Sequence, residues 1–326
     1  MGEMQRKLIQ PIGNEMLNYF ESMGFTKVEA ISAGASEDKK YYVETRKGES
    51  LLARASPILN KPKKIANMLS QFEMMQHLAA AGVSMSELTR FYILDKSKLL
   101  HYYKWCNGVV LYRQVKNDNV IDDEKYKLGV KMGEITKNIH TVSVEKQSNI
   151  FKTMKNKVDR ELKAYSKSNI RSLVSDNLIS FISNHNIDFL KDRPVSLIHG
   201  DLNMSNAILN DKGEIFIIDW EQICYGDPLF DLAKVELNVG INSHFGTGMM
   251  NGYLKEDFVD DFSLTTFRFY FAFKMLNGLR FYLKREKRNR IKIAYRSLNW
   301  FDSHYGLKEF NFSAELLNEL DKLKSE

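Results

Sequence analysis

The sequence is poor in the features that mark secreted, membrane-spanning or metal-cluster proteins. Its 326 residues include two cysteines, Cys106 and Cys224, which lie far apart in the chain. Such a pair supplies neither a disulfide framework nor a thiolate metal site, and it fits a reducing compartment. There is no window of about 18 apolar residues, the length that a membrane-spanning helix needs, and no signal-peptide core at the N-terminus. We therefore expect a cytoplasmic protein without a membrane partner.

Charge of one sign is not concentrated in the sequence. Lys and Arg number 47 and Asp and Glu 41, which gives a net charge of +6 and a pI of about 9.0. This balance suits an anionic ligand without selecting one. The basic residues are scattered except in the run at 284–292, which is typical of a solvated helix face. We expect no nucleic-acid partner; the alternative of a nucleic-acid-binding protein rests only on the pI and this run.

Two short apolar runs, at 195–199 and 215–219, are each followed by polar residues. Val, Ile and Phe favour an extended backbone, so both runs predict strands. The residues NDKG at 210–213 predict a turn just before the second strand, so that a small hairpin forms. The polar side chains expected on loops at one end of this hairpin are Asp201, Asn206 and Asp219.

These three side chains suit phosphoryl transfer from a nucleotide. That reaction needs a carboxylate beside the attacking hydroxyl and oxygen ligands that hold Mg²⁺ against the phosphates. Asp201 can be the first, and Asn206 and Asp219 the second. His-x-Asp-x-x-x-x-Asn, followed by an apolar strand that ends in Asp, is the kinase arrangement of catalytic loop and metal ligand. Any one of these residues alone could cap a turn, but their joint spacing favours a metal–nucleotide site.

The motifs in this stretch resemble one family more closely than they resemble protein kinases in general. HGDLNMSNAIL, IIDWE and YGDPLFDLA resemble the aminoglycoside phosphotransferase and choline kinase family, most strongly over 195–239 and more weakly over 31–305. The resemblance implies an α+β, bilobal, protein-kinase-like fold. A small N-lobe at 1–104 would hold an antiparallel sheet and one helix. A larger, mainly helical C-lobe at 105–326 would hold the catalytic loop, the metal site and the acceptor pocket.

The resemblance also implies roles in the N-lobe. The hairpin at 28–45 would cover the nucleotide phosphates with the backbone N–H groups of Ala35 and Ser36, although an ordinary turn remains open because a G-x-G-x-x-G loop is absent. Arg54 lies where the family most often has a Lys that reaches the phosphates, and Glu73 lies where the family has the partner of that cation. A surface Arg and a solvated Glu are the alternatives. The hinge near 102–105 would contact adenine through the backbone, at Tyr103.

Several C-lobe segments have expected roles of other kinds. Residues 150–190 are expected to form two helices that wall the acceptor site. The glycine-rich segment at 244–253 is expected to be a connecting loop rather than part of the acceptor pocket. The aromatic residues of 264–283 recur at helical spacing, which predicts a core helix. His140 is expected to be structural.

The resemblance implies transfer of the γ-phosphate of ATP or GTP, with Mg²⁺, to a hydroxyl of a small molecule. Trp220-Glu221 after Asp219, without a later Ala-Pro-Glu segment, disfavours a protein acceptor. An aminoglycoside-type antibiotic is the expected acceptor. The alternatives are a metabolite such as choline, methylthioribose or homoserine, or a non-catalytic coat-type relative. The carboxylates that could hold a polycationic acceptor, or only brace the loop, are Glu221, Asp227, Asp231 and Glu236.

Overall fold

The fold is known from a computed structural model, which describes residues 9–10, 14–32, 38–58, 62–94, 98–142, 150–167, 176–184, 187–239, 243–255 and 261–284. The chain divides into two compact units. The first consists of Met1–Gly108 and Ile208–Glu221, and the second of Val109–Ala207 and Gln222–Glu326. Each unit is described separately below. Among the described residues, no helix has the length and apolar character that crossing a bilayer requires.

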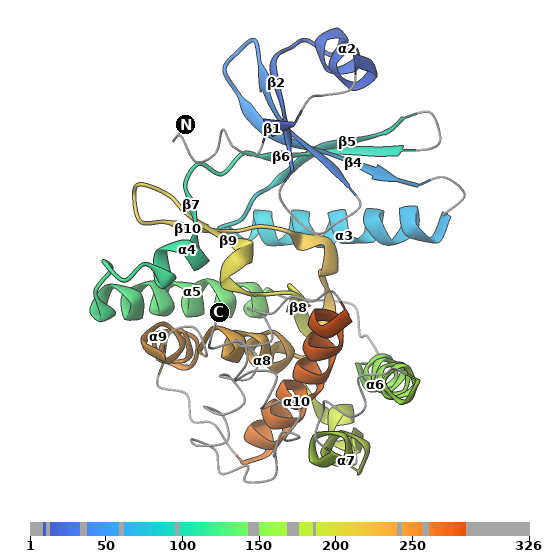
Figure 1. The fold of residues 1–326 in the computed structure, drawn as a ribbon, viewed down its shortest axis with the longest axis vertical. Coiled ribbons are helices and arrows are strands. Elements are labelled where there is room, and N and C mark those ends of the chain that lie inside the picture. Colours follow the sequence, from blue (N-terminus) through green and yellow to red (C-terminus); the bar gives the residue numbers. More distant parts are fainter. Residues whose placement is uncertain are drawn as a thin grey trace. The chain divides into compact units, whose positions relative to one another are not determined.

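The first unit is built on a six-stranded antiparallel sheet (Figure 1). Its strands in spatial order are β1 (Ile9–Gln10), β2 (Phe25–Ile31), β3 (Lys39–Thr45), β4 (Ser50–Pro57), β6 (Lys98–Lys104) and β5 (Leu88–Leu94). Two helices accompany it, α2 (Asn14–Ser22) and α3 (Pro62–Ala80). The sheet and its helix α3 agree with the N-lobe that the sequence predicts.

Alternation along the strands gives this sheet one apolar face. Side chains on successive residues point to opposite faces. Tyr41 and Val43 of β3, Leu51 and Ala53 of β4 and Tyr102 of β6 all lie in one buried cluster. Phe20 from α2 belongs to the same cluster. The intervening positions of these strands therefore belong to the other face, which carries polar side chains.

The predicted hairpin between the runs at 195–199 and 215–219 is wrong in its first strand, because the strand in the first run, β8 (Ser196–Ile198), pairs with β11 (Cys224–Gly226). The hairpin that forms joins β9 (Ala207–Leu209) to β10 (Ile215–Ile217), with its turn at the predicted residues 210–213. Its turn is closed by the Asn210 side chain, which accepts hydrogen bonds from the backbone N–H groups of Lys212 and Glu214. Its second strand bonds to the segment before β5, because Ser86 N donates to Ile217 O at 2.9 Å and Ile217 N to Ser84 O at 3.1 Å. The hairpin therefore belongs to the first unit.

The observed units differ from the predicted division in two ways. The first unit extends to Gly108 rather than ending at 104, and it includes Ile208–Glu221, which lies about 100 residues further along the chain. The physical reason is the backbone pairing between Ile217 and the segment at 84–86, a long-range contact. A division by contiguous ranges therefore assigned this segment to the wrong unit.

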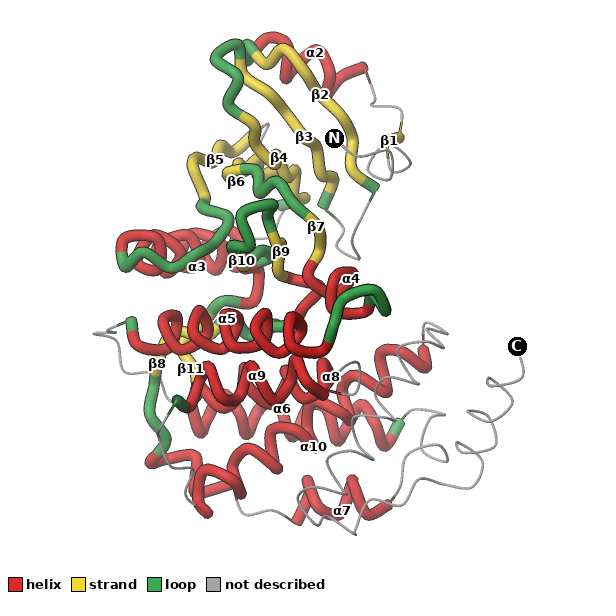
Figure 2. Tube along the Cα trace, turned by 90° about the vertical axis from the view of Figure 1, so that its left-hand side faces the viewer, coloured by secondary structure: helices red, strands yellow, loops and turns green. Residues whose placement is uncertain are grey.

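The second unit is mainly helical (Figures 1 and 2). Its elements are β7 (Val109–Val110), α4 (Leu111–Lys116), α5 (Asp122–Thr141), α6 (Ile150–Ser166), α7 (Asp176–Asn184), η2 (Ile187–Asp192), β8 (Ser196–Ile198), η3 (Met204–Asn206), β11 (Cys224–Gly226), α8 (Pro228–Val239), α9 (Ser243–Leu254) and α10 (Asp261–Lys284). A short 3-10 helix, η4 (Trp220–Gln222), follows Asp219 at the end of the first unit's segment Ile208–Glu221. The helices α6 and α7 lie in the range where the sequence predicts two.

Helix α10 forms much of the core of the second unit. Phe269, Tyr270, Phe271 and Phe273 are each at most 1% exposed. Aromatic side chains at these positions bury large apolar surfaces against α8 and α6. The prediction that the aromatic residues of this segment form a core is confirmed for its described part.

The segment at 244–253 is part of helix α9, so the prediction of a connecting loop is wrong. Its glycines allow α9 to pack tightly on α5 (Figure 2). A Cβ added at Gly248 would lie 2.1 Å from the carbonyl oxygen of Tyr126, and one at Gly252 would lie 2.1 Å from that of Val130. On α5, Gly133 approaches the backbone of Met249 in the same way. Glycine here serves close helix contact rather than a turn.

We expect Gly133→Ala to lower the free energy of unfolding by about 1–3 kcal/mol, the usual effect of overpacking. The new methyl would lie 2.1 Å from the carbonyl oxygen of Met249, so the two helices must separate. Denaturant unfolding measures the change, with Lys131→Ala, an exposed position on the same helix, as the control. A variant at least as stable as the wild type would contradict the close approach.

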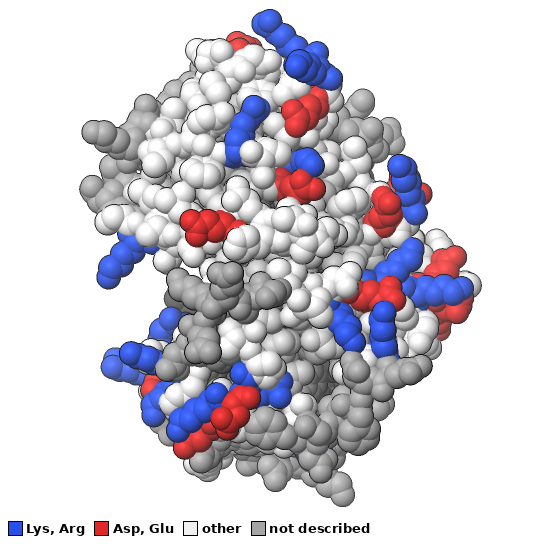
Figure 3. All heavy atoms as spheres, turned by 180° about the vertical axis from the view of Figure 1, so that it is seen from behind, with Lys and Arg blue, Asp and Glu red and all other residues white. Residues whose placement is uncertain are grey.

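Surface charge is mixed. On the face drawn in Figure 3, Lys and Arg side chains are interspersed with Asp and Glu side chains. Several pairs are within 4 Å, among them Lys127–Asp123 on α5 and Lys104–Glu87 in the first unit. The basic run at 284–292, on which the nucleic-acid alternative depends, lies outside the described residues apart from Lys284.

Candidate functional site

Contacts with Gln222 and Asp231 hold the loop after β8 in shape. Gly200 has φ of +80°, and a Cβ there would lie 2.4 Å from the carbonyl oxygen of Gln222, so glycine is required. The backbone N–H groups of His199 and Gly200 both donate to the Asp231 carboxylate, at 2.6 and 2.8 Å. One buried carboxylate of α8 therefore fixes the backbone that leads into Asp201.

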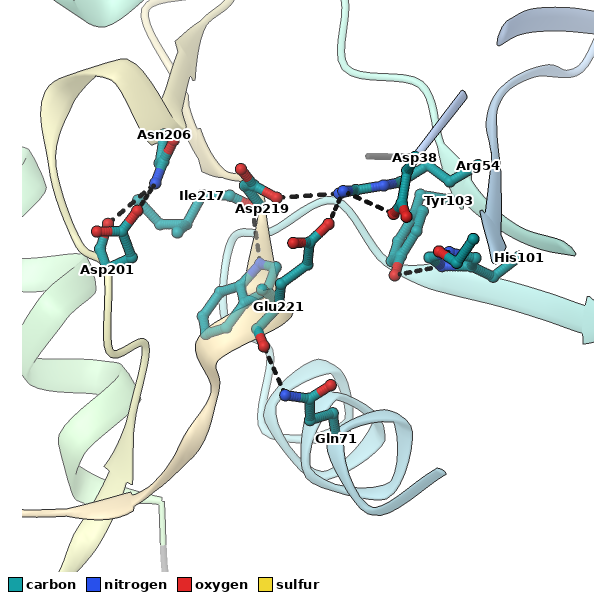
Figure 4. A network of polar contacts seen from close by, with 12 residues as sticks. Asp38, Arg54, Gln71, His101, Tyr103, Asp201, Asn206, Ile217, Asp219 and Glu221 are labelled. Atoms are coloured by element: carbon teal, nitrogen blue, oxygen red, sulfur yellow. Dashed lines mark hydrogen bonds and ion pairs between the residues drawn. The ribbon is translucent and has the colours of Figure 1, made fainter. Parts of the chain in front are cut away.

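Asp201 and Asn206 are joined within this loop (Figure 4). The Asn206 amide nitrogen donates to the backbone oxygen of Asp201 at 2.9 Å and to its carboxylate at 3.2 Å. The Asp201 N–H also lies 3.2 Å from Nδ1 of His199. Both side chains are half-buried. Because its nitrogen faces Asp201, the carbonyl oxygen Oδ1 is the atom of Asn206 that can coordinate a cation.

Asp231 lies at the centre of a buried polar network. Its carboxylate is 3.3 Å from Nε2 of His140, whose Nδ1 bonds to the hydroxyl of Tyr253 at 3.0 Å. Complete burial by itself raises the pKa of Asp231, but the His140 hydrogen bond and the positive charges of His140 and Lys274 lower it further than burial raises it. The net result is a lowered pKa, so Asp231 is ionised at neutral pH. His140 acts by positioning Asp231, which agrees with the structural role predicted for it.

Asp227 is also held by hydrogen bonds within the protein. The guanidinium of Arg193 donates to its two carboxylate oxygens, from Nε at 2.7 Å and from the second terminal nitrogen at 3.1 Å. Tyr270 and the N–H of Leu229 also donate to it, the latter at the start of α8. Asp227 and Asp231 are 1% and 0% exposed. Of the two open readings for these carboxylates, bracing is the one that their contacts fit. The sequence did not single out Arg193.

A buried lysine, Lys274 of α10, lies beside this network. Its Nζ is 3.8 Å from the centre of the Phe230 ring and, among the described residues, has no hydrogen-bond partner. Burial lowers the pKa of Lys274 to about 7, although the Asp231 carboxylate acts in the opposite direction. An unfolded lysine has a pKa of about 10.4. Between these values the unfolded chain holds the proton and the folded chain does not, so the cost of burying Lys274 falls as the pH rises.

We expect Lys274→Met to raise the free energy of unfolding at pH 6 by about 1–4 kcal/mol, the range for replacing buried charged groups by apolar ones. The gain over the wild type should shrink as the pH rises from 7 towards 10, because neutral Lys274 is cheaper to bury. Urea unfolding of both proteins at several pH values measures this gap. A difference in unfolding free energy of zero, or one that increases with pH, would show that burial of the charged Lys274 does not destabilise the fold.

In the first unit, Arg54 of β4 is surrounded by carboxylates (Figure 4). Its guanidinium lies 2.9 Å from Asp219 and 3.1 Å from Asp38 and is also paired with Glu221. The Arg54 side chain is 4% exposed, whereas those of Asp219 and Glu221 are 38% and 42% exposed. The strand cation is thus buried and faces the segment after β10, and its charge is already balanced by acidic groups.

The predicted pair between Arg54 and Glu73 is wrong. Glu73 is exposed on α3, and among the described residues it makes no ion pair with Arg54. The residue of α3 that faces this network is Gln71, whose amide donates to the backbone oxygen of Glu221. Two residues along a helix turn the side chain by about 200°, so Glu73 points away when Gln71 points in. Glu221, next to Trp220, takes the place expected of Glu73.

Asp219 has an unusual backbone. Its φ is +67°, a left-handed conformation that non-glycine residues rarely adopt and that clusters at functional sites. Asp tolerates it better than most residues. The following Trp220 is buried and its indole N–H donates to Ile217 O at 3.1 Å, which fixes the turn. The turn therefore sets the direction of the Asp219 carboxylate at the end of the hairpin.

The residues predicted to hold Mg²⁺ fit that ion chemically. Asp219 offers a partly exposed carboxylate and Asn206 an amide oxygen, both hard oxygen donors. Among the described residues, no group of three or more His, Cys, Asp and Glu side chains could hold a metal. Mg²⁺ typically keeps several waters and takes substrate phosphates as ligands, so it needs few oxygen donors from the protein.

Tyr103 lies inside the sheet. Its partners in the neighbouring strands are Leu52 and Leu88. Its hydroxyl is 2.9 Å from Nδ1 of His101, whose Nε2 is 3.0 Å from the hydroxyl of Ser56. The chain leaves the first unit after residues 105–108, beyond Tyr103. An adenine contact at Tyr103 stays a prediction, and Ala35 and Ser36 lie outside the described residues.

The antiparallel sheet with α3 and the mainly helical second unit define an α+β fold of the protein-kinase-like class. The chain belongs to the phosphotransferase enzyme family, whose sequence model matches residues 27–262. The resemblance inferred from the sequence motifs is thereby confirmed. No curated protein matches the chain.

Solved structures of similar fold share little sequence with it. A thermostable mutant of aminoglycoside phosphotransferase APH(4)-Ia is 15% identical, with a TM-score of 0.62 over 89% of this chain and 98% of that one. The amicoumacin kinase hAmiN, in complex with AMP-PNP, Ca²⁺ and Ami, is 17% identical, with a TM-score of 0.58 over 96% and 92%. Macrolide 2′-phosphotransferase MphH from Brachybacterium faecium is 13% identical, with a TM-score of 0.56 over 88% and 98%.

Proposed function

We propose that the chain transfers the γ-phosphate of ATP or GTP to a hydroxyl of a small molecule. Asp201 orients that hydroxyl and accepts its proton, and Asn206 and Asp219 hold Mg²⁺. Membership of the phosphotransferase family supports the reaction class. The observation that carries the assignment of residues is the hydrogen-bonded pair of Asp201 and Asn206, on a loop fixed by a buried, ionised Asp231.

The proposed roles follow from the geometry of each part. Asn206 donates to a carboxylate oxygen of Asp201, which restricts the rotamer of that side chain. A positioned carboxylate is what phosphoryl transfer asks of its base. When bound, Mg²⁺ would neutralise the charge of the β- and γ-phosphates. Asp219, partly exposed after a rigid turn, and Oδ1 of Asn206 would provide its protein ligands.

The proposed acceptor is an aminoglycoside-type antibiotic. Solved structures of similar fold include complexes with hygromycin B and with spectinomycin and a macrolide 2′-phosphotransferase. A polycationic acceptor needs carboxylates that are free to meet it. Asp227 and Asp231 are buried and committed to Arg193 and to the catalytic loop, so other acidic residues would have to serve. The Glu236 side chain lies outside the described part of the structure.

That same observation favours a second candidate, a kinase whose acceptor carries little positive charge, such as methylthioribose or homoserine. Two of the four carboxylates named for a polycation are unavailable to any ligand, which removes much of the sequence-based support for one. A third reading, a non-catalytic coat-type relative, would retain nucleotide binding at most and show no transfer. The three readings differ in a single assay.

The test is acceptor-dependent release of nucleoside diphosphate by the purified chain, with ATP or GTP and Mg²⁺. The panel spans aminoglycosides, spectinomycin, macrolides, choline, methylthioribose and homoserine. Release with one acceptor and phosphate found on that acceptor would support the proposed reaction and name its substrate class. Nucleotide binding without release by any acceptor would support the non-catalytic reading. Absence of all nucleotide binding would contradict the proposed function altogether.

A further inference from the structure

The polar face of the first unit carries a second cation beside Arg54. Lys40 of β3 is the direct partner of Arg54 across the β3–β4 pair. Directly opposed residues of antiparallel strands point to the same face, with Cβ atoms about 4.5–5.5 Å apart. Arg54 is in turn opposite His101 on β6. Lys40, Arg54 and His101 therefore form one row across the sheet, on the face opposite the apolar cluster.

The two cations in this row, Lys40 and Arg54, differ in the number of their carboxylate partners. Arg54 is surrounded by Asp219, Asp38 and Glu221. For Lys40, no ion pair or hydrogen bond of the side chain is found among the described residues, and the side chain is half-buried. One guanidinium facing three carboxylates presents an incoming polyphosphate with a net negative surface. The lysine beside it presents an ammonium with three N–H donors, none of which has a partner in the described part of the chain.

The electrostatic surroundings of Lys40 place it in the same neighbourhood. Burial lowers its pKa, and the positive charge of Arg54 lowers it further, whereas Asp219 and Asp38 act in the opposite direction. Lys40 is thus close enough to interact electrostatically with Asp219, the proposed metal ligand, without forming an ion pair with it. An anion that bound at this position would relieve both the burial of the ammonium and its repulsion by Arg54.

We propose that Lys40 is the residue that binds the nucleotide phosphates, while Arg54 serves as a positioning residue that holds Asp219 and Glu221 in place. This inference rests on the proposed function and assigns a different cation to the phosphates than the sequence did. Arg54 is the more buried of the two, and the carboxylates of Asp38, Asp219 and Glu221 already balance its charge. Lys40 can bind a phosphate without breaking any contact within the described chain.

The experiment measures binding of Mg-ATP, Mg-ADP and adenosine to the full chain by calorimetry. We expect Lys40→Met to weaken binding of both Mg-nucleotides by about 10- to 100-fold, the range for a charged hydrogen bond, and to leave adenosine binding unchanged. Lys40→Arg should restore most of the loss, because it keeps the charge. The matched control is Lys39→Met, since Lys39 is exposed and points to the opposite face of the same strand. Thermal unfolding verifies that each variant folds.

The outcomes separate this proposal from the proposed function. Selective loss of Mg-nucleotide affinity in Lys40→Met, with Lys39→Met unchanged, supports the role of Lys40. Wild-type affinity in Lys40→Met would overturn it and leave phosphotransfer intact. An equal loss for adenosine would show that the substitution disturbs the sheet rather than a phosphate contact, which also overturns it. A wild-type protein that binds adenosine but no Mg-nucleotide would contradict the proposed function and the role of Lys40 together.

Discussion

Asp201→Asn is expected to lower kcat by about 10²–10⁴-fold, the usual contribution of a positioned general base. The substituted amide keeps the shape of the side chain and its contact with Asn206, so the loop should retain its structure. It cannot accept the proton of the acceptor hydroxyl. Affinity for Mg-nucleotide should stay within about twofold of the wild type, since Asp201 is not proposed to contact the metal.

The measurement is steady-state phosphate transfer with the acceptor found in the panel, together with calorimetric binding of Mg-ATP. The matched control is Asp211→Asn, the same substitution at an exposed position in the turn of the β9–β10 hairpin, which should keep full activity. Turnover of Asp201→Asn at the wild-type rate would refute the assignment of the base. Loss of nucleotide binding in this variant would instead place Asp201 among the metal ligands.

Asp231→Asn is expected to destabilise the chain by about 3–5 kcal/mol, the cost of breaking a buried, hydrogen-bonded charge. The wild-type carboxylate accepts from His199 N, Gly200 N and His140 and is fully buried. An amide has a single acceptor oxygen and would turn its NH₂ group towards one of these N–H donors. The loop before Asp201 would lose its support, so activity should fall along with stability.

Denaturant unfolding measures this loss, with Asp123→Asn, an exposed position on α5, as its control. The sign of the pH dependence follows from the lowered pKa of Asp231. Its stabilisation is fully present above the unfolded value of about 3.9 and is lost as the pH falls through the lower folded value. The gap between wild type and variant should therefore be constant near neutrality and shrink in acid. A variant within 0.5 kcal/mol of the wild type, a figure of roughly the size of surface effects, would contradict the bracing role.

Sequence alone was sufficient where the chemistry is local. Asp201 and Asn206 lie five residues apart on one loop, and their hydrogen bond joins neighbours in the chain. The polar residues at 210–213 gave the turn before β10, although the strand that pairs with β10 lies at 207–209 rather than at the predicted 195–199. The aromatic helix was correctly assigned to the core, because periodic apolar side chains have few other uses. These features depend on interactions over short spans, which a motif or a period expresses directly.

The tertiary structure decided what depends on residues distant in sequence. Both Glu73 and Gln71 are polar residues of α3, and the sequence does not show which of them faces Arg54. The orientation of α3 in the structure shows that it is Gln71, which bonds to Glu221. From the sequence, the glycines of α9 predicted a loop. The structure shows that they allow the backbone of α5 to approach the helix closely. Lys40 gave no signal in the sequence, because its relation to Arg54 arises from the register between two strands.

The sequence by itself therefore determined the reaction class, which contiguous motifs express, and it led to the residues that we propose for the catalytic loop. Only the tertiary structure decided which carboxylates are committed and which cations are not. Asp227 and Asp231 bind Arg193 and the loop, and Arg54 is enclosed by acidic groups, whereas Lys40 has no partner among the described residues. The physical reason is that hydrogen bonds and charges pair through space, so the partner of a charged side chain depends on the fold that brings the two together.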